Sequence, residues 1–571
     1  MKYLLVGINA KYIHSCPAIY SLKAYAGYYH PDADIHTAEY TINQRTEDVI
    51  KGIYSFQPDF IGISCYIWNI DMVMKVVGSL KKLLPKADIW LGGPEVSFNA
   101  KERMNGAEEI FGIMVGEGEK TFDELIDVYE KQKPFSAVAG IVYRNGNCVV
   151  SNSARECIDF SSVPFIYDDV RDFDNRIIYY ESSRGCPFGC GYCLSAVEKK
   201  LRFRSLEQVK NELLFFLEHK VKQVKFIDRT FNCDHERTVE ILYFIREHDN
   251  GITNFHFEIA GDILSEEEIE ILSSLRKGLV QLEIGVQTTN ADALEAVHRR
   301  TDMVTLSRNV RRLLSNDNIH LHLDLIAGLP YEDFDSFVNS FNEVYSMGGH
   351  ELQLGFLKLL HGAPLADAAD KYGILASAYP PYEVLRTRWI SYDELLILKQ
   401  TEEMLEIYHN SEQFRYSEAF ILKYEKTPFD FYYNLSKYYE KKGYAVIQSS
   451  RMRKYEILFE YFKDEVSAEF KSEENKEVNI LAEYLTCDYY ERENAKSRPY
   501  FSANPDTRRI RAFYEDEDNR EKYLSDYAMY SAKELQRITH LEIMNYIEEG
   551  KMALFDYSKG NVSFIAALQS N

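Results

Sequence analysis

The chain has 571 residues, of which 46% are hydrophobic and 27% charged, and its formal net charge is −23. This length exceeds what one hydrophobic core usually serves, so we expect about three domains in an ordinary soluble globular protein. Such an acidic balance argues against a protein that binds nucleic-acid phosphates over a broad surface, because that function needs a basic footprint.

The amino-terminal residues and the cysteines indicate where in the cell the protein is located. The start, MKYLLVGINAKY, has one lysine and a short apolar run that breaks at Gly7, which is typical of a first strand and not of a signal peptide. No run of about 18 apolar residues occurs, so we expect no membrane span. The cysteines form no regular disulfide framework, and a reducing, cytoplasmic location fits them.

Residues 1–135 are predicted to form a doubly wound, Rossmann-like α/β domain. Helical patterns alternate with apolar runs that are typical of buried parallel strands. Because ligands of such sheets bind at the carboxyl ends of the strands, we expect a binding site on the loops that follow them. The apolar runs begin at Lys2, Phe60, Asp88 and Phe111.

Three further regions follow in chain order. Residues 136–170 are predicted to form a β-hairpin, with its turn at Asn145-Gly146, and a linker. Residues 171–375 contain six successive βα units, which predict a partial (β/α)6 barrel with its chemistry on the loops after each strand. Tyrosine-rich, charged helical patterns then predict a mainly α-helical domain over residues 376–571, in which we find no chemical motif.

Three cysteines follow the first predicted barrel strand. Cys186, Cys190 and Cys193 lie in the segment SSRGCPFGCGYCLSA with the spacing C-x3-C-x2-C. A structural zinc site takes four ligands, and no fourth Cys or His stands nearby in a matching pair. Redox chemistry of a C-x2-C pair would leave Cys186 without a role. Three thiolates on an iron–sulfur cluster would leave one iron open to bind a substrate or cofactor.

This spacing, with the aromatic Tyr192 before the last cysteine, resembles that of the radical SAM superfamily. The resemblance implies a [4Fe–4S] cluster whose open iron chelates S-adenosylmethionine (SAM) and whose electron releases a 5′-deoxyadenosyl radical. No protein base is needed for this step, so no catalytic side chain is assigned. The resemblance also implies a set of SAM-binding residues. The alternative is that these residues are polar groups of the barrel interior that hydrogen-bond only to their neighbours. The SAM-binding residues that the resemblance implies are Tyr192, Glu258, Gln287, Arg299 and Asp324.

An α/β domain before such a barrel resembles the cobalamin-binding arrangement of radical SAM proteins. The usual cobalt-ligating motif, D-x-H-x-x-G, is missing, since the corresponding loop NAKYIHSCPA offers only His14, and the lower cobalt ligand stays open. The segment GEGEKT does not satisfy the phosphate-loop pattern. A Rossmann-like remnant without a ligand is the alternative. The cobalamin-binding residues that the resemblance implies are Ser64, Gly92, Gly93 and Glu117.

The resemblance implies an enzyme that methylates an unactivated carbon of an unidentified small-molecule or peptide substrate, with a low-potential electron donor such as flavodoxin or ferredoxin. Cyclisation, rearrangement or oxidation without methyl transfer is the first alternative. A tRNA methylthiotransferase would need three further cluster cysteines in the first domain, where only Cys16 and Cys65 stand before residue 140. A non-catalytic cobalamin sensor is the third alternative, although a sensor needs no reducible cluster.

Overall fold

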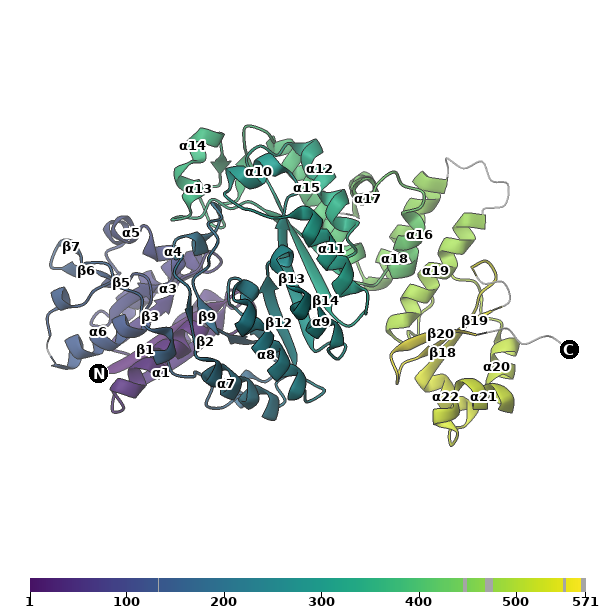
Figure 1. Ribbon diagram of the computed structural model, residues 1–571, viewed down its shortest axis with the longest axis horizontal. Coiled ribbons are helices and arrows are strands. Elements are labelled where there is room, and N and C mark those ends of the chain that lie inside the picture. Colours follow the sequence, from purple (N-terminus) through teal and green to yellow (C-terminus); the bar gives the residue numbers. More distant parts are fainter. Residues whose placement is uncertain (132, 445–448, 468–475, 548–550, 566–571) are drawn as a thin grey trace. The chain divides into compact units, whose positions relative to one another are not determined.

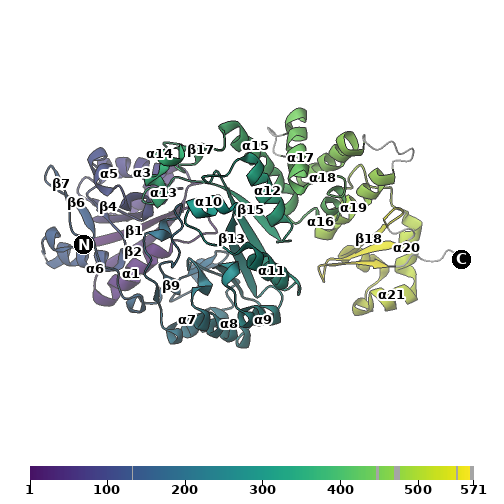
Figure 2. The same cartoon turned by 45° about the horizontal axis from the view of Figure 1, so that its top comes forward.

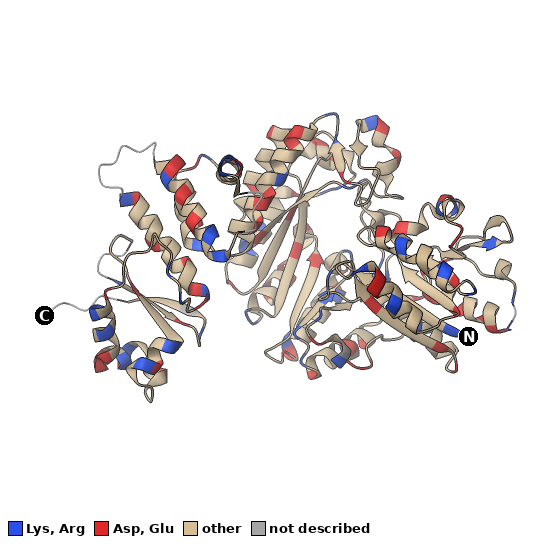
Figure 3. Cartoon of the chain, turned by 180° about the vertical axis from the view of Figure 1, so that it is seen from behind, with Lys and Arg blue, Asp and Glu red and all other residues tan. Residues whose placement is uncertain are grey.

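The computed structural model (Figure 1) describes most of the chain. None of the helices in this described part is both long enough and apolar enough to cross a membrane. Figure 3 shows acidic and basic residues mixed along the described helices. The described residues are 1–131, 133–444, 449–467, 476–547 and 551–565.

The chain divides into two compact units. The first unit comprises residues 1–349 and 354–392, and the second comprises residues 350–353 and 393–571. The first unit thus contains both the predicted α/β domain and nearly all of the predicted barrel. The first unit ends at Tyr392, whereas the sequence predicts that the helical domain begins at residue 376. The predicted domain boundary therefore stays a prediction.

The amino-terminal part of the first unit is a seven-stranded sheet in the order β2-β1-β3-β4-β5-β6-β7. Its first five strands pair in parallel, which confirms the doubly wound α/β fold. The hairpin predicted next to a linker is β6–β7, and it extends this sheet because β6 pairs antiparallel with β5. The strands are β1 (Lys2–Asn9), β2 (Asp34–Thr41), β3 (Phe60–Ser64), β4 (Asp88–Gly92), β5 (Gly112–Met114), β6 (Ile141–Asn145) and β7 (Cys148–Ser151).

Apolar side chains cover both faces of this sheet, because successive residues of a strand point to opposite sides. In β1, Leu4 and Val6 belong to one buried cluster, while Tyr3 and Leu5 belong to the other. Burial on both faces explains why the strands appear in the sequence as continuous apolar runs. The helices of this part are α1 (Pro17–Tyr29), α2 (Thr46–Ser55), α3 (Ile70–Leu83), α4 (Pro94–Ser97), α5 (Ala100–Gly106) and α6 (Glu119–Lys131).

A six-stranded sheet in the order β15-β14-β13-β12-β11-β8 forms the partial barrel. The strands follow one another in chain order, and the pairs from β8 to β14 are parallel, as six βα units predict. Helices α7, α8 and α9 lie side by side on its outer face (Figure 2). The strands are β8 (Ile178–Tyr180), β11 (Gln223–Phe226), β12 (Asn254–Ile259), β13 (Val280–Gln287), β14 (His320–Ala327) and β15 (Glu351–Phe356).

Burial alternates along the two longest barrel strands. Every second residue of β13 and β14 is apolar and fully buried, and the residues between are only partly buried and, apart from Ile326, polar or small. The strands therefore present an apolar side to the helices and a polar side to the barrel interior. The helices are α7 (Leu206–Glu218), α8 (His235–Glu247), α9 (Glu266–Ser274), α10 (Ala291–Ala296), α11 (Met303–Leu314) and α12 (Phe334–Tyr345).

Two short hairpins complete the first unit. Strands β9 (Ser183–Arg184) and β10 (Arg202–Phe203) pair antiparallel and enclose the cysteine segment. Strands β16 (Leu375–Ala376) and β17 (Val384–Arg386) follow two short helices, α13 (Pro364–Asp367) and α14 (Ala369–Tyr372).

The second unit is mainly helical, as predicted, and its tyrosines form much of its core. Tyr408, Tyr432 and Tyr455 are fully buried. A three-stranded antiparallel sheet that was not predicted stands at its end, formed by β18 (Thr539–Ile543), β19 (Met552–Asp556) and β20 (Asn561–Ile565). The helices are α15 (Tyr392–Leu405), α16 (Arg415–Ile421), α17 (Pro428–Lys442), α18 (Arg451–Tyr461), α19 (Lys476–Arg492), α20 (Thr507–Glu515), α21 (Glu517–Tyr523) and α22 (Ala532–Ile538).

Candidate functional site

The strand that leads into the cysteine segment is held by a buried carboxylate. Asp228, which follows β11 and is 2% exposed, accepts hydrogen bonds from the backbone N–H of Ser182 at 2.7 Å and of Ser183 at 3.1 Å. The Ser182 hydroxyl donates to its other oxygen at 2.5 Å. Burial raises the pKa of Asp228, against the opposing effect of these bonds. Asp228 thereby joins the second barrel strand to the start of the cysteine loop.

The three cysteines lie on one loop, and each sulfur has a polar neighbour. The Cys186 Sγ is 3.7 Å from the Thr230 hydroxyl, and the Cys193 Sγ accepts the backbone N–H of Ser195 at 3.4 Å. Arg299 Nη1 donates to the Cys190 Sγ at 3.6 Å. Cys186 and Cys190 are each 8% exposed and none of the three is in a disulfide. Such donors stabilise thiolates, which are the form that binds metal.

The sulfur positions discriminate between a single ion and a cluster. The ligand atoms of Cys186, Cys190 and Cys193 do not all lie within 4.8 Å of one another. A tetrahedral zinc ion would need such convergence, because each sulfur lies only about 2.3 Å from the metal. An iron–sulfur cluster places each thiolate on a different iron and tolerates the wider spacing. The geometry therefore fits a cluster better than a structural zinc ion.

The cysteine loop is packed tightly against the segment that follows it. Gly185 has a φ of +89°, and a Cβ at this position would lie 2.4 Å from the carbonyl oxygen of Lys200. The backbone N–H of Cys186 donates to Glu198 O at 3.1 Å, and that of Gly191 to Val297 O at 2.7 Å. The glycines and these backbone bonds fix the path of the loop before any ligand is bound.

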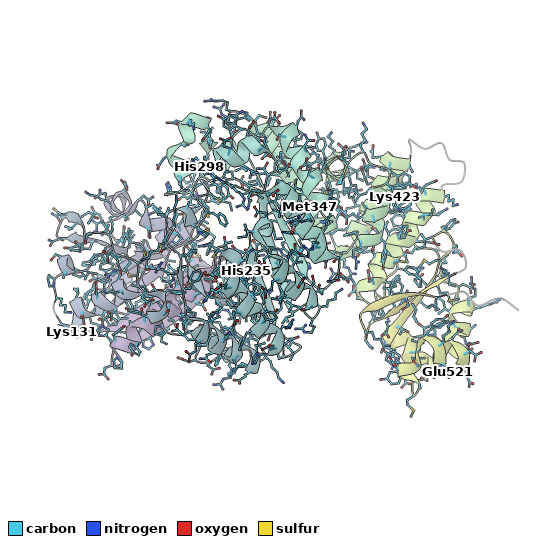
Figure 4. All side chains as sticks on the ribbon, in the orientation of Figure 1. Lys131, His235, His298, Met347, Lys423 and Glu521 are labelled. Atoms are coloured by element: carbon cyan, nitrogen blue, oxygen red, sulfur yellow. The ribbon has the colours of Figure 1, made fainter. Side chains whose placement is uncertain are left out.

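Arg299 joins the cysteine loop to the fourth barrel strand. Besides the Cys190 sulfur, its guanidinium contacts the Tyr192 hydroxyl at 3.4 Å and the carbonyl oxygen of Gly285. Its Nε is buried and has no hydrogen-bond partner among the described residues. His298, labelled in Figure 4, precedes it in the turn after α10 and has a φ of +55°. This turn directs Arg299 toward the barrel interior with one donor left free.

The end of β13 is strained at another predicted SAM residue. Gln287 has a φ of +74°, and the pairing register with β14 shifts between Gly285 and Gln287. A Cβ at Gly285 would lie 2.2 Å from the Gln287 Nε2, so a larger residue there would displace the end of this side chain. The Gln287 Oε1 is buried and unpaired in the described part of the chain. Backbone strain of this kind gathers at ligand sites.

Three carboxyl groups meet inside the barrel and differ in charge. Glu283 accepts hydrogen bonds from His256 at 3.0 Å and Lys225 at 3.1 Å. These bonds outweigh burial and lower the pKa of Glu283 to about 2. Burial, and then the charge of Glu283, raise the pKa of Glu258 to about 7 and that of Asp324 to about 8. Near neutral pH in the ligand-free protein, Asp324 is therefore mostly protonated, Glu258 is about half protonated and Glu283 is ionised.

The raised pKa of Asp324 predicts a stability that falls with rising pH. Asp324 ionises near pH 4 when unfolded and near pH 8 when folded, so its contribution is complete below pH 4 and is lost as the pH rises to about 8. In ligand-free Asp324→Asn this loss is absent. Between pH 5 and 8 the variant should therefore gain about 3–4 kcal/mol relative to the wild type in urea unfolding.

The exposed Asp370→Asn serves as the control for this prediction, since its unfolding curve should keep the wild-type dependence on pH. If the free energy of unfolding depended on pH in the same way in Asp324→Asn and in the wild type, the raised pKa assigned to the Asp324 carboxyl group would be wrong.

These groups surround one cavity that encloses about 650 Å³, including the part open to solvent. Among the described residues, the buried atoms of this cavity without a hydrogen-bond partner are Asp324 Oδ1, Gln287 Oε1 and the N–H donor Arg299 Nε. A SAM molecule offers complementary groups, namely ribose hydroxyls, an ammonium and a carboxylate, and guanidinium suits the carboxylate. The cavity fits SAM, and its lining includes Cys190, Glu258, Gln287, Arg299 and Asp324.

Some of the residues predicted to bind cobalamin lie at the carboxyl edge of the first sheet and contact other parts of the chain there. The Ser64 hydroxyl lies 3.3 Å from the sulfur of Cys16. Gly93 has a φ of +107°, and a Cβ there would lie 2.5 Å from the carbonyl oxygen of Cys65. At Gly92 a Cβ would make only ordinary contacts of 3.7 Å or more. The close crossing of the chain thus accounts for glycine at position 93 without a ligand.

A pair of stacked aromatic rings at this edge was not predicted. Tyr66 and Trp68, in the loop after β3, have ring centroids 4.3 Å apart and planes 6° apart. Trp68 donates its indole N–H to Ile8 O at 3.3 Å and is 45% exposed. The segment CYIWN directly after a buried strand was the signal available in the sequence. A flat, partly exposed aromatic surface at the carboxyl edge of the strands fits a planar macrocycle.

Two other groups considered for cobalamin face the barrel. Glu117 Oε1 accepts hydrogen bonds from Arg184 at 3.0 Å and Arg202 at 2.8 Å, and its Oε2 accepts the backbone N–H of Ile158 at 3.0 Å. His14 Nδ1 lies 2.6 Å from the hydroxyl of Tyr179 on β8. Burial, assisted by nearby cations, lowers the pKa of His14. The hydrogen-bonding capacity of Glu117 is used within the chain.

Three domain families match the chain. The B12 binding domain family matches residues 3–126, and the Radical SAM superfamily matches residues 180–344. A third family, described as a protein of unknown function (DUF4080), matches residues 370–557. The chain therefore contains a B12-binding domain followed by a radical SAM domain.

Two curated relatives are similar over part of the chain. The cobalamin-dependent radical SAM methyltransferase TokK of Streptomyces tokunonensis is 26% identical over 340 residues, which are 56% of this chain and 50% of TokK. The 2-(S-pantetheinyl)-carbapenam-3-carboxylate methyltransferase of Streptantibioticus cattleyicolor is 24% identical over 442 residues, 71% of this chain and 65% of that enzyme. The chain thus spans half to just under two thirds of the length of these relatives.

A solved structure shares the fold over a larger part. The cobalamin-dependent S-adenosylmethionine radical enzyme OxsB, with aqua-cobalamin and S-adenosylmethionine bound, matches with a TM-score of 0.61 at 14% identity. The match covers 85% of this chain and 84% of OxsB. At this identity the likeness establishes a common fold.

Proposed function

We propose that this chain, which joins a B12-binding domain to a radical SAM domain, is a cobalamin-dependent radical SAM enzyme that methylates an unactivated carbon. The observation that carries the proposal is the cavity beside the cysteine loop. There Cys190 and Arg299 lie together with the unpaired polar atoms of Gln287 and Asp324. The similarity to two methyltransferases supports methyl transfer as the outcome.

Each part of the site has a role in this proposal. When bound, the cluster supplies the electron that cleaves SAM to a 5′-deoxyadenosyl radical, and cobalamin supplies the methyl group. Cys186, Cys190 and Cys193 would hold three of the irons and leave the fourth open. Cys186 and Cys190 are nearly buried on this loop, with 8% of each exposed.

The cavity residues would orient SAM. Arg299 offers its unpaired Nε to a carboxylate, and Gln287 and Asp324 offer acceptors to hydroxyl or ammonium groups. A cation bound beside Glu258 and Asp324 would favour their ionised forms and lower their raised pKa values. Binding of SAM would therefore release protons from the cavity.

Cobalamin would lie at the carboxyl edge of the first sheet, near Ser64, the Gly92-Gly93 turn and the stacked ring of Trp68. A low-potential electron donor such as flavodoxin or ferredoxin, and a cytoplasmic location that keeps the cysteines reduced, belong to the same proposal. The substrate would be a small molecule or a peptide.

Anaerobic reconstitution tests the proposal. The wild-type chain should bind about four irons and about one cobalt, and release 5′-deoxyadenosine from SAM under strong reductant. Methyl transfer predicts S-adenosylhomocysteine as a second product once a substrate is supplied. A reconstituted chain that contains iron but no cobalt would contradict cobalamin-dependent methyl transfer, although it would still be compatible with SAM cleavage. Release of 5′-deoxyadenosine without S-adenosylhomocysteine during substrate turnover would instead support cyclisation, rearrangement or oxidation.

A further inference from the structure

A cluster of charged side chains links the first sheet to the cysteine loop. Arg184 on β9 and Arg202 on β10 are direct partners across the small hairpin that encloses this loop. Both guanidinium groups point to carboxylates at the end of the GEGE segment, just after β5. Arg184 contacts Glu117 at 3.0 Å and Glu119 at 2.6 Å, and Arg202 contacts Glu117 at 2.8 Å.

The four side chains, which we call the arginine clamp (Glu117, Glu119, Arg184 and Arg202), are well removed from water. The exposed fraction is 15% for Arg184 and 4% for Glu119. The charge of Arg184 lowers the pKa of Glu119 against the opposing effect of burial, so the carboxylate stays ionised. Exposed ion pairs contribute little, whereas breaking a buried, hydrogen-bonded pair leaves an uncompensated charge. The clamp therefore resists separation of the elements that it joins.

The position of the clamp gives it a consequence beyond stability. Arg184 lies two residues before Cys186, and between them Gly185 is held by the crossing segment at Lys200. Glu119 is the first residue of α6, and the loop before it follows β5 at the edge proposed for cobalamin. Ser21 of α1 donates to the same Glu119 oxygen at 2.8 Å, which ties the clamp to a second helix of that domain.

We infer that Arg184 and Arg202 are positioning residues that set the distance between the cobalamin edge of the first sheet and the cluster loop. The inference rests on the proposed function, and it assigns to Glu117 a role different from cobalamin binding. Reactions between two bound groups tolerate little displacement, since a misplacement of about 1 Å costs on the order of 100-fold in rate. A buried, bidentate arginine suits this task better than lysine, because its planar fork fixes direction as well as distance.

The test uses the reconstituted full chain with both Arg184→Gln and Arg202→Gln. The readout is the magnetic interaction between reduced cluster and paramagnetic cobalamin in electron paramagnetic resonance, which depends on their separation. The wild type should show one discrete interaction, and the double variant should lose it while iron and cobalt contents stay at the wild-type level. Arg184→Gln alone provides a milder variant should the double variant fail to fold.

Arg155→Gln is the matched control. Arg155 is 7% exposed and pairs with Glu124, which is 30% exposed. Its other bonds go to Thr121 and to the carbonyl oxygen of Ala139, so the substitution breaks a partly buried ion pair beside α6 and away from the cysteine loop. It should leave the interaction unchanged. An unaltered interaction in the Arg184 variants, or loss of iron with cobalt retained, would overturn the inference. Failure of the proposed function would give a different result from failure of this inference. If the proposed function is wrong, the reconstituted wild-type chain itself lacks cobalt or iron, and this is seen before any variant is compared.

Discussion

In the Cys190→Ala variant, iron content should fall from about four per chain to near zero, and release of 5′-deoxyadenosine should fall by at least about 100-fold. Loss of a partner that only supports a metal ligand costs 10–100-fold, so loss of a ligand itself should cost at least as much. Cys190 is nearly buried on a loop whose path is fixed by backbone bonds, and alanine there offers no other sulfur. Iron analysis, the visible spectrum and product chromatography under anaerobic conditions measure the effect.

Cys148→Ala is the control for this experiment, because Cys148 is an exposed cysteine on β7, outside the cysteine loop. It should leave iron content and SAM cleavage unchanged. If Cys190→Ala retained four irons and cleaved SAM, or if the wild type carried zinc in place of iron, the assignment of the three thiolates to a cluster would be wrong.

Trp90→Ala should lower the free energy of unfolding of the first domain by about 3–5 kcal/mol, the usual cost of truncating a large buried aromatic residue. Trp90 on β4 is fully buried and stacks near Phe60 and Phe135, with ring centroids 6.1 Å away in each case. Its indole N–H donates to the Tyr129 hydroxyl at 2.9 Å, so the variant also leaves this buried hydroxyl without its donor. Cobalamin binding should weaken with the sheet that carries the proposed site.

Trp68→Ala offers a control with the same substitution at a partly exposed ring of the same domain. It should cost clearly less than Trp90→Ala, because the Trp68 ring is already 45% exposed and therefore loses less buried surface. Hydrogen exchange of the β3, β4 and β5 amides is the measurement of choice, since a chain of several domains need not unfold in one step. Equal protection in the two variants would show that Trp90 does not support this core.

Features carried by short stretches of sequence were predictable. The C-x3-C-x2-C spacing brings three thiols onto one loop by chain connectivity alone. Strands β1, β3, β4 and β5 of the first sheet were predictable because burial on both faces demands continuous apolar runs, whereas the partly exposed edge strand β2 was not predicted. The succession of barrel strands was predictable because each βα unit is local and neighbouring units pair in chain order. Glu258, Gln287 and Asp324 line one cavity because the loops and polar faces of parallel strands converge at the same end of a barrel.

Other features depended on contacts between distant segments. The sequence does not reveal that β6 would extend the first sheet, nor that a short three-stranded sheet would end the second unit, because strand pairing depends on partners elsewhere in the chain. The positive φ of Gln287 likewise depends on the register shift against β14.

Glu117 is the clearest case of a role decided by tertiary structure. From its loop alone it was predicted to bind cobalamin, yet its oxygens accept hydrogen bonds from arginines 67 and 85 residues away. Composition and spacing by themselves determined which chemistry this chain carries, since thiolate number and strand pattern are local properties. Only the folded chain decided which carboxylates stay free for a ligand, because a buried charge takes whichever partner the packing of remote elements brings within reach.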